Sequence, residues 1–132
     1  MTDHTARIDG LRAWARGMTT THAAAELLIA YGPPLLTGPW VEHDPERGRY
    51  WFNTDTVTER SGYLSGGEAR VLYLAAAILD DDHHVRLGDA LAGLDRRTLP
   101  LVLDAVRRAA GQEPNEIPDP PSDPWAGSET SM

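Results

Sequence analysis

The sequence predicts a mainly α-helical protein: a small bundle of about four helices with a short β-hairpin insertion and a disordered acidic C-terminal tail. Three observations lead to this fold class. Apolar residues recur at helical spacing in four stretches, strand-forming aromatic residues flank one turn, and the last residues combine proline with acidic side chains. With 132 residues, of which 41% are hydrophobic, the chain suits one domain, which we assign to residues 1–111.

The composition excludes several kinds of chemistry. The chain has no Cys, so disulfides, a Cys nucleophile and thiolate metal sites are excluded. All twelve basic residues are Arg, and without Lys there is neither a P-loop nor a Schiff base. A net charge of −8 disfavours direct binding of nucleic acid. The sequence has no apolar run long enough to span a membrane and no secretory signal, so we expect a cytoplasmic protein without a membrane partner.

Apolar spacing predicts the first two helices. The apolar residues of the first stretch are Ile8, Leu11, Ala15 and Met18. Trp14 lies beside them, and Gly17 is expected to end this helix. The apolar face of the second helix holds Ala24, Leu27, Leu28 and Tyr31. We expect a hydroxyl of Thr19–Thr21 to cap its N-terminus and Gly32-Pro33-Pro34 to end it.

Residues 35–53 predict a short β-hairpin. The strand-preferring residues are Trp40, Val41, Tyr50, Trp51 and Phe52. Between them, Asp44–Gly48 has the composition of a turn. Because two strands alone are marginal in water, one face of the hairpin must pack on the helices.

The alternation of the second strand singles out Trp51. Tyr50 and Phe52 share one face and Trp51 lies on the other. If Tyr50 and Phe52 pack inward, Trp51 is exposed near the two arginines of the hairpin, Arg47 and Arg49. Tryptophan beside arginine is typical of a protein interface. The alternative is that Trp51 lies beneath residues 33–39.

The third helix has the clearest start signal. Ser65 and Glu68 have the spacing of a capping box, directly before the almost wholly apolar run Val71–Leu79. A helix that is apolar on all sides is a buried one, so we place this helix at the centre of the core. Asp80-Asp81-Asp82 is expected to end it in water.

The fourth helix follows a short helical turn at 87–94. Asp95 or Thr98 is expected to cap it. Its predicted buried stripe consists of Leu99, Val102, Leu103, Val106 and Ala110. Arg107 and Arg108 suit the negative end of the helix dipole.

Residues 112–132 are predicted to be disordered, because prolines break any helix and few apolar residues repay the ordering entropy. Five acidic residues and no basic residue lie in this tail. Trp125 is a candidate docking anchor within it. The candidate partner contacts of the whole chain are therefore Trp40, Trp51 and Trp125.

The segment Leu64–Val71 resembles the signature segment of ABC-type ATPases, in which a Leu-Ser-Gly-Gly loop opens a helix. Ala92–Asp95 is similar to the D-loop of that family, so the resemblance covers residues 64–111. It implies an accessory role, in which these segments complete a partner's nucleotide site. Gly88 and Asp89 stand where the family has its magnesium-binding Asp and catalytic Glu, and the P-loop is missing.

The same residues have a purely structural interpretation, in which Ser65 and Glu68 form a capping box and Asp95 caps a helix. The glycine-rich helix start remains a candidate anion site, formed by Ser65, Gly66 and Gly67. Asp80–His84 contains residue types that bind metals, but adjacent residues rarely all face one ion, so we expect no metal and no cofactor. No nucleophile, base and carboxylate occur at a recognisable spacing, so we predict no catalytic residues.

We interpret the chain as a non-catalytic, small acidic protein that binds or regulates another protein, of the kind found in mobile-element or phage-defence systems. Two other classes stay open. One is the ABC-ATPase-like accessory domain described above, which predicts nucleotide-dependent association with a second protein. The other is an acidic mimic of nucleic acid that inhibits a nucleic-acid enzyme, which predicts salt-sensitive binding.

Overall fold

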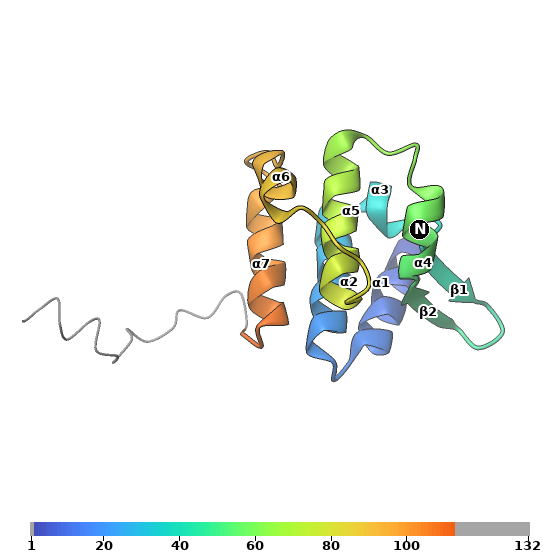
Figure 1. The fold of residues 1–132 in the computed structure, drawn as a ribbon. Coiled ribbons are helices and arrows are strands. Elements are labelled where there is room, and N and C mark those ends of the chain that lie inside the picture. Colours follow the sequence, from blue (N-terminus) through green and yellow to red (C-terminus); the bar gives the residue numbers. More distant parts are fainter. Residues whose placement is uncertain (1, 113–132) are drawn as a thin grey trace, which may run out of the picture.

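The computed structural model describes residues 2–112, and the predicted mainly α-helical class with one hairpin is confirmed there (Figure 1). The elements in chain order are α1 (Thr2–Ala15), α2 (Thr19–Tyr31), α3 (Pro33–Leu36), β1 (Val41–Asp44), β2 (Arg49–Phe52), α4 (Thr54–Arg60), α5 (Gly66–Leu79), α6 (Leu87–Ala92) and α7 (Leu99–Ala109). None of the described helices is both long enough and apolar enough to cross a membrane. The tail beyond Gln112, for which disorder is predicted, lies outside the described residues.

Helices α2 and α5 form the centre of the bundle. Helix α5 contacts α2, α3, α4, α6 and α7, which confirms the central position predicted for it. Helix α2 also contacts α1, α3 and α7. Its buried apolar residues are Ala23, Ala24, Ala25, Leu27 and Leu28. Short alanine side chains let neighbouring helices approach closely, so α2 can be surrounded on several sides.

The turn between α1 and α2 differs from the prediction in one respect. Gly17 follows the end of α1 as expected, with a φ of 84° that favours glycine. The expected hydroxyl cap from Thr19–Thr21 is wrong, because α2 begins at Thr19 itself. Met18 is the N-cap, its backbone is extended, and it contributes no side-chain hydrogen bond. The tight turn at Gly17 brings the chain into the helix before a threonine can take the cap position.

The predicted hairpin is confirmed. Strands β1 and β2 pair antiparallel, with Val41 opposite Phe52 and Asp44 opposite Arg49. Two short helices beside it were not predicted. Helix α3 begins within the Pro-Pro sequence that ends α2, because proline is accepted in the first turn of a helix. Helix α4 begins after Asn53, whose side chain accepts a hydrogen bond from the Asp55 amide at 3.0 Å.

The capping box at the start of α5 is confirmed. The Glu68 amide donates to Ser65 Oγ at 3.2 Å, and the Ser65 amide donates to Glu68 Oε1 at 3.0 Å. Asp80 ends α5 as predicted, and its carboxylate accepts hydrogen bonds from Thr54 Oγ1 and from the Asp82 amide. The expectation that α5 is buried on all sides is too broad, since Tyr73 is exposed.

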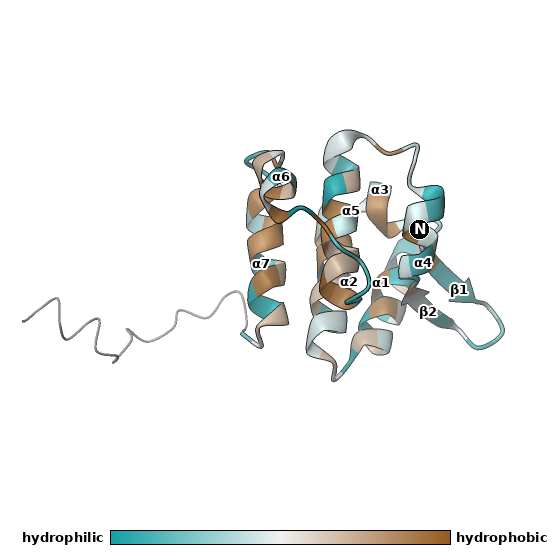
Figure 2. Cartoon of the chain, viewed as in Figure 1, coloured by the Kyte–Doolittle hydropathy of each residue, from teal (hydrophilic) through white to brown (hydrophobic). Residues whose placement is uncertain are grey.

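Helix α7 is rotated relative to its predicted buried stripe. Val102 and Ala105 are buried, whereas four residues of the predicted stripe are exposed: Leu99, Leu103, Val106 and Ala110. Hydrophobic residues are accordingly visible on the face of α7 toward the viewer (Figure 2). The small side chain of Ala105 allows α7 to lie close to α2, and this contact decides the rotation. Thr98 is the N-cap residue of α7 but makes no side-chain cap hydrogen bond, and Asp95 Oδ1 accepts the Thr98 amide at 2.8 Å in the turn before the helix.

Candidate functional site

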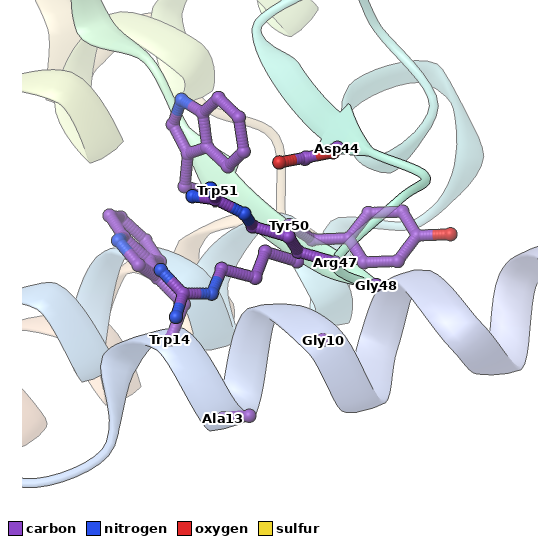
Figure 3. A pocket seen from close by; sticks show the side chains of 9 residues that line it. Gly10, Ala13, Trp14, Asp44, Arg47, Gly48, Tyr50 and Trp51 are labelled. Atoms are coloured by element: carbon purple, nitrogen blue, oxygen red, sulfur yellow. The ribbon is translucent and has the colours of Figure 1, made fainter.

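A pocket of about 600 Å³ lies between α1 and the β2 side of the hairpin (Figure 3). Its walls combine aromatic rings with guanidinium groups. We define this aromatic groove by Trp14, Arg47, Arg49, Tyr50 and Trp51. Figure 3 shows the two indoles rising from α1 and β2 toward one end of the pocket, with the Tyr50 ring pointing toward the other. Its volume is that of a site for a small ligand or for a few peptide side chains.

A glycine of α1 determines how closely the hairpin approaches. A Cβ atom at Gly10 would overlap the Tyr50 ring, so the ring lies directly on the helix backbone. On its other side Tyr50 stacks on His43, with ring centroids 4.0 Å apart and planes at 7°. These two contacts fix the Tyr50 ring and hold β2 against α1. Trp51, the next residue of β2, is thereby positioned at the groove.

Trp51 lies on the opposite face of β2 from Tyr50 and Phe52, as strand alternation predicts. Phe52 is buried in the core, whereas Trp51 is partly exposed. The second wall of the groove is Trp14, in the last turn of α1. The alternative position for Trp51, beneath residues 33–39, is taken by Trp40 instead.

The rim of the groove is positively charged. Arg47 and Arg49 are both exposed there, and one carboxylate, Asp44, faces them. Asp44 Oδ1 also accepts a hydrogen bond from the Glu46 amide at 3.1 Å, which holds the turn. Two guanidinium groups against one carboxylate give the groove a local excess of positive charge in a chain whose net charge is −8. Such a site attracts acidic groups.

Trp40 does not form part of this site, and its prediction as a partner contact is wrong. Its side chain is fully buried, and its indole N–H donates to the Leu35 carbonyl oxygen at 2.7 Å. A Cβ atom at Gly38 would overlap its ring, and Tyr63 stacks on it from the outside. A tryptophan directly before a strand is buried here because α3 and the residues after it fold over it. Trp125 lies outside the described residues.

A second charged region lies on the other side of α1. Arg12 donates two hydrogen bonds to the buried Glu26 of α2, at 2.8 and 3.1 Å. Burial alone would raise the pKa of Glu26, but the hydrogen bonds and charge of Arg12, together with His22 and Arg108, lower it. We name Arg12, Arg16 and Arg108 the arginine cluster, since they line one surface pocket around Glu26. Sequence reasoning missed this cluster because Arg108 is distant in the chain from Arg12 and Arg16.

The predicted anion site at the start of α5 holds a carboxylate of its own. The capping box uses the amides of Ser65 and Glu68, and it places the charge of Glu68 at the positive end of the helix. Gly66 and Gly67 are exposed beside it. Binding of an external anion by Ser65, Gly66 and Gly67 stays a prediction. The two segments of the ABC-type resemblance do meet, because Gly93 packs against the Arg70 side chain.

The acidic and histidine run after α5 forms a local turn. Asp80 binds Thr54 and the Asp82 amide, and these hydrogen bonds lower the pKa of its carboxyl. The His84 ring lies 3.1 Å from the Asp81 carbonyl oxygen. Within residues 2–112, no three histidine or carboxylate side chains gather in a way that could hold a metal ion.

Comparison of the chain with protein-family models, with curated proteins and with solved structures found no match. The chemistry of the aromatic groove is therefore the basis for a function. Indole faces bind apolar and proline side chains, and guanidinium groups bind carboxylates. Contacts of these two kinds are suited to the recognition of a peptide or protein ligand. The residues that sequence reasoning did not single out are Gly10 and Trp14, although small residues at Gly10 and Ala13 leave room on α1 for a strand.

Proposed function

We propose that the chain is a cytoplasmic, non-catalytic protein-binding protein, and that its aromatic groove holds an extended, acidic, proline-containing segment of its partner. The observation that carries this proposal is the pair of indoles, Trp14 and Trp51, which lie on separate elements and share one pocket with two exposed arginines. Tryptophan and arginine contribute most to binding energy at protein interfaces. A groove that combines them is suited to an interface rather than to solvent.

Proline is favoured as the apolar part of the ligand because of the shape of the groove. Its walls are flat rings from a helix and a strand, and proline-rich segments in the polyproline II conformation dock into aromatic-lined grooves. Such a segment is already extended before it binds, so little conformational entropy is lost. Trp14 and Trp51 would contact successive prolines in this arrangement.

Acidic residues are favoured because of the rim. Arg47 and Arg49 present planar guanidinium groups that can bind carboxylates through two parallel hydrogen bonds. Because this chain has a net charge of −8, its other residues repel an acidic ligand at long range. Binding therefore depends on these two local cations. Salt should therefore weaken binding, since the two arginines are exposed to solvent.

The proposal is tested by fluorescence polarisation with labelled synthetic peptides that alternate Asp or Glu with Pro. We expect these peptides to bind the full chain, and Trp51→Ala to weaken binding by about tenfold or more, as for an interface hot spot. The matched control is Leu103→Ala, which removes an exposed apolar side chain on α7, away from the groove. It should leave the affinity unchanged.

A second set of peptides checks the charge requirement. Peptides with Asn and Gln in place of Asp and Glu keep the prolines but lose the carboxylates, and they should bind more weakly to the wild-type chain. The proposal is contradicted if no acidic proline peptide binds. It is equally contradicted if Trp51→Ala and Leu103→Ala have the same effect on the affinity.

A further inference from the structure

We infer that the C-terminal segment of this chain, residues 113–125, is itself a ligand of the aromatic groove and occupies it when no partner is bound. This inference rests on the proposed function, because it takes the groove to be a site for an acidic proline-containing peptide. The segment has that composition. Half of the ten prolines of the chain lie in it: Pro114, Pro118, Pro120, Pro121 and Pro124. Four acidic residues alternate with them: Glu113, Glu116, Asp119 and Asp123.

The segment starts close to the groove. Gln112, the last described residue, lines one small surface pocket together with Gly17 and Met18. Its amide donates to the Arg107 carbonyl oxygen at 2.8 Å, after a left-handed turn at Gly111 with a φ of 88°. Gly17 directly follows the last turn of α1, which carries Trp14. The chain therefore leaves the folded part beside the helix that forms one wall of the groove.

The segment is long enough to cross the groove. A polyproline II chain rises about 3.1 Å per residue, so residues 113–121 can span about 28 Å. The chain from Gly17 back to Gly10 of α1 covers about 10 Å at the helical rise of about 1.5 Å per residue. The proline-rich centre of the segment, 118–121, can thus reach Trp14 and Trp51 without extension to its limit.

Positive charge lies beside the start of the segment and again at the groove. The pocket lined by the arginine cluster shares Gly17, His22 and Arg108 with the pocket that Gln112 lines. Arg108 Nε is buried and has no hydrogen-bond partner among the described residues, so an acceptor is missing beside the start of the segment. Glu113 and Glu116 can supply carboxylates there. Arg47 and Arg49 then receive the later acids at the groove, against the single carboxylate of Asp44.

The exposed apolar face of α7 fits this segment less well. Leu99, Leu103 and Val106 lie at the i, i+4 and i+7 positions of one helix. A helical stripe of that kind binds the apolar face of an amphipathic helix. Five prolines within eleven residues prevent residues 114–124 from forming one. The segment is therefore assigned to the aromatic groove.

The test uses paramagnetic broadening in the full chain. Because the sequence has no Cys, Ser122→Cys provides a unique site for a nitroxide label. We expect the amides of Gly10 and Ala13 and the indole N–H groups of Trp14 and Trp51 to lose most of their peak intensity. The loss should persist on dilution, as a contact within one molecule requires. Reduction of the nitroxide should restore the peaks.

A control separates docking from random encounters. The same labelled chain with both Arg47→Gln and Arg49→Gln should regain the groove intensities, because the acids lose their partners. Broadening centred on Leu103 instead of the groove, broadening that disappears on dilution, or no broadening at all would each overturn the inference.

A competition measurement separates this inference from the proposed function. Replacing the acids of the tail by their amides should strengthen binding of the external acidic proline peptide severalfold, since a site that is free more often has a higher apparent affinity. These acids are Glu113, Glu116, Asp119, Asp123 and Glu129. If the peptide binds equally well to both chains, the inference fails while the function stands. If the label broadens the groove but no external peptide binds, the function fails and the tail contact stands.

Discussion

Two tryptophans of the β-hairpin lie near its open end, each close to a glycine contact, yet one belongs to the core and the other to the surface. Trp40, before β1, is fully buried and donates its indole N–H to Leu35. Trp51, in β2, is partly exposed and lines the aromatic groove. Gly38 lets the Trp40 ring lie against the backbone, and Gly10 does the same for Tyr50 beside Trp51.

The difference between the two tryptophans lies in what covers them. A short helix, α3, and the residues after it fold back over Trp40, and the stacked Tyr63 closes the outer side. Trp51 lines the groove together with Trp14 of α1 and stays partly exposed. The residue type is the same, and both residues lie near the open end of the hairpin. The covering element therefore decides whether an aromatic residue stabilises the fold or is available for binding.

The largest expected effect comes from Trp40→Ala. Removal of a fully buried indole from the core should lower the free energy of unfolding by about 3–5 kcal/mol. Urea denaturation followed by circular dichroism measures it. Trp40→Phe refines the result, because it keeps most of the apolar volume but removes the indole N–H that donates to the Leu35 carbonyl oxygen, at a cost of about 0.5–1.5 kcal/mol. A change below about 1 kcal/mol for Trp40→Ala would show that the Trp40 side chain is not part of the core.

A pair of glycine substitutions sharpens the comparison. Gly38→Ala places a Cβ atom in the fully buried Trp40 ring and should destabilise the fold by about 1–3 kcal/mol. Gly10→Ala makes the same kind of overlap with Tyr50, but Tyr50 is partly exposed and can move, and alanine gains about 1 kcal/mol of helix propensity over glycine. We expect the smaller loss at Gly10. Equal losses, measured by urea denaturation, would contradict the different rigidity of the Trp40 and Tyr50 rings.

The elements that the sequence predicted correctly depend on short-range signals. The capping box of α5 requires only Ser65 and Glu68, the hairpin requires a turn between aromatic strands, and the end of α1 requires Gly17. In each case the residues that make the interaction are within a few positions of one another. Local physical chemistry is then sufficient to determine the structure.

The features that the sequence did not predict depend on contacts between distant segments. Trp14 and Trp51 meet across the groove, and Arg12 meets Glu26, only after α1 has packed on its neighbours. The rotation of α7 was predicted incorrectly because two of its faces are apolar and only the packing against α2 selects one. For the candidate site, strand alternation identified Trp51. No local rule could identify Trp14, the second wall of the groove, because it lies on a different element.

An acid titration tests the ion pair that joins α1 to α2, on the side of α1 away from the groove. The pKa of Glu26 is below its ordinary value of 4.5, so its contribution to stability is complete above that value and is lost as the pH falls through the folded-state pKa. Urea midpoints should therefore decrease on acidification. Because Arg12 is half exposed, the pair should contribute only about 1 kcal/mol.

The matched variant for this titration is Glu26→Gln. It should be less stable than the wild type at neutral pH, and the two stabilities should converge as the pH falls, because the wild-type carboxyl becomes neutral as well. A remaining acid dependence in the variant is expected, since the pKa values of Asp80 and Asp95 are also lowered by their hydrogen bonds. Parallel curves for the two chains would show that the Arg12 pair does not stabilise α1.

The smallest effect on stability and the sharpest contrast with Trp40 is expected for Trp51→Ala. A partly exposed side chain at an open groove leaves no closed cavity when it is removed, so the free energy of unfolding should change by about 0.5 kcal/mol or less. The same substitution should nevertheless reduce peptide affinity, because a binding contact is absent from the free state. Thermal denaturation and fluorescence polarisation on the same sample measure both quantities.

The two tryptophans therefore predict opposite outcomes in the two measurements. For Trp51→Ala, loss of affinity with retained stability assigns Trp51 of β2 to binding. A loss of stability as large as that of Trp40→Ala would instead show that Trp51 closes the core against α1. The groove would then be a gap in the packing of the hairpin, and partner binding would have to be sought on the exposed apolar face of α7, where Leu103 is 51% exposed.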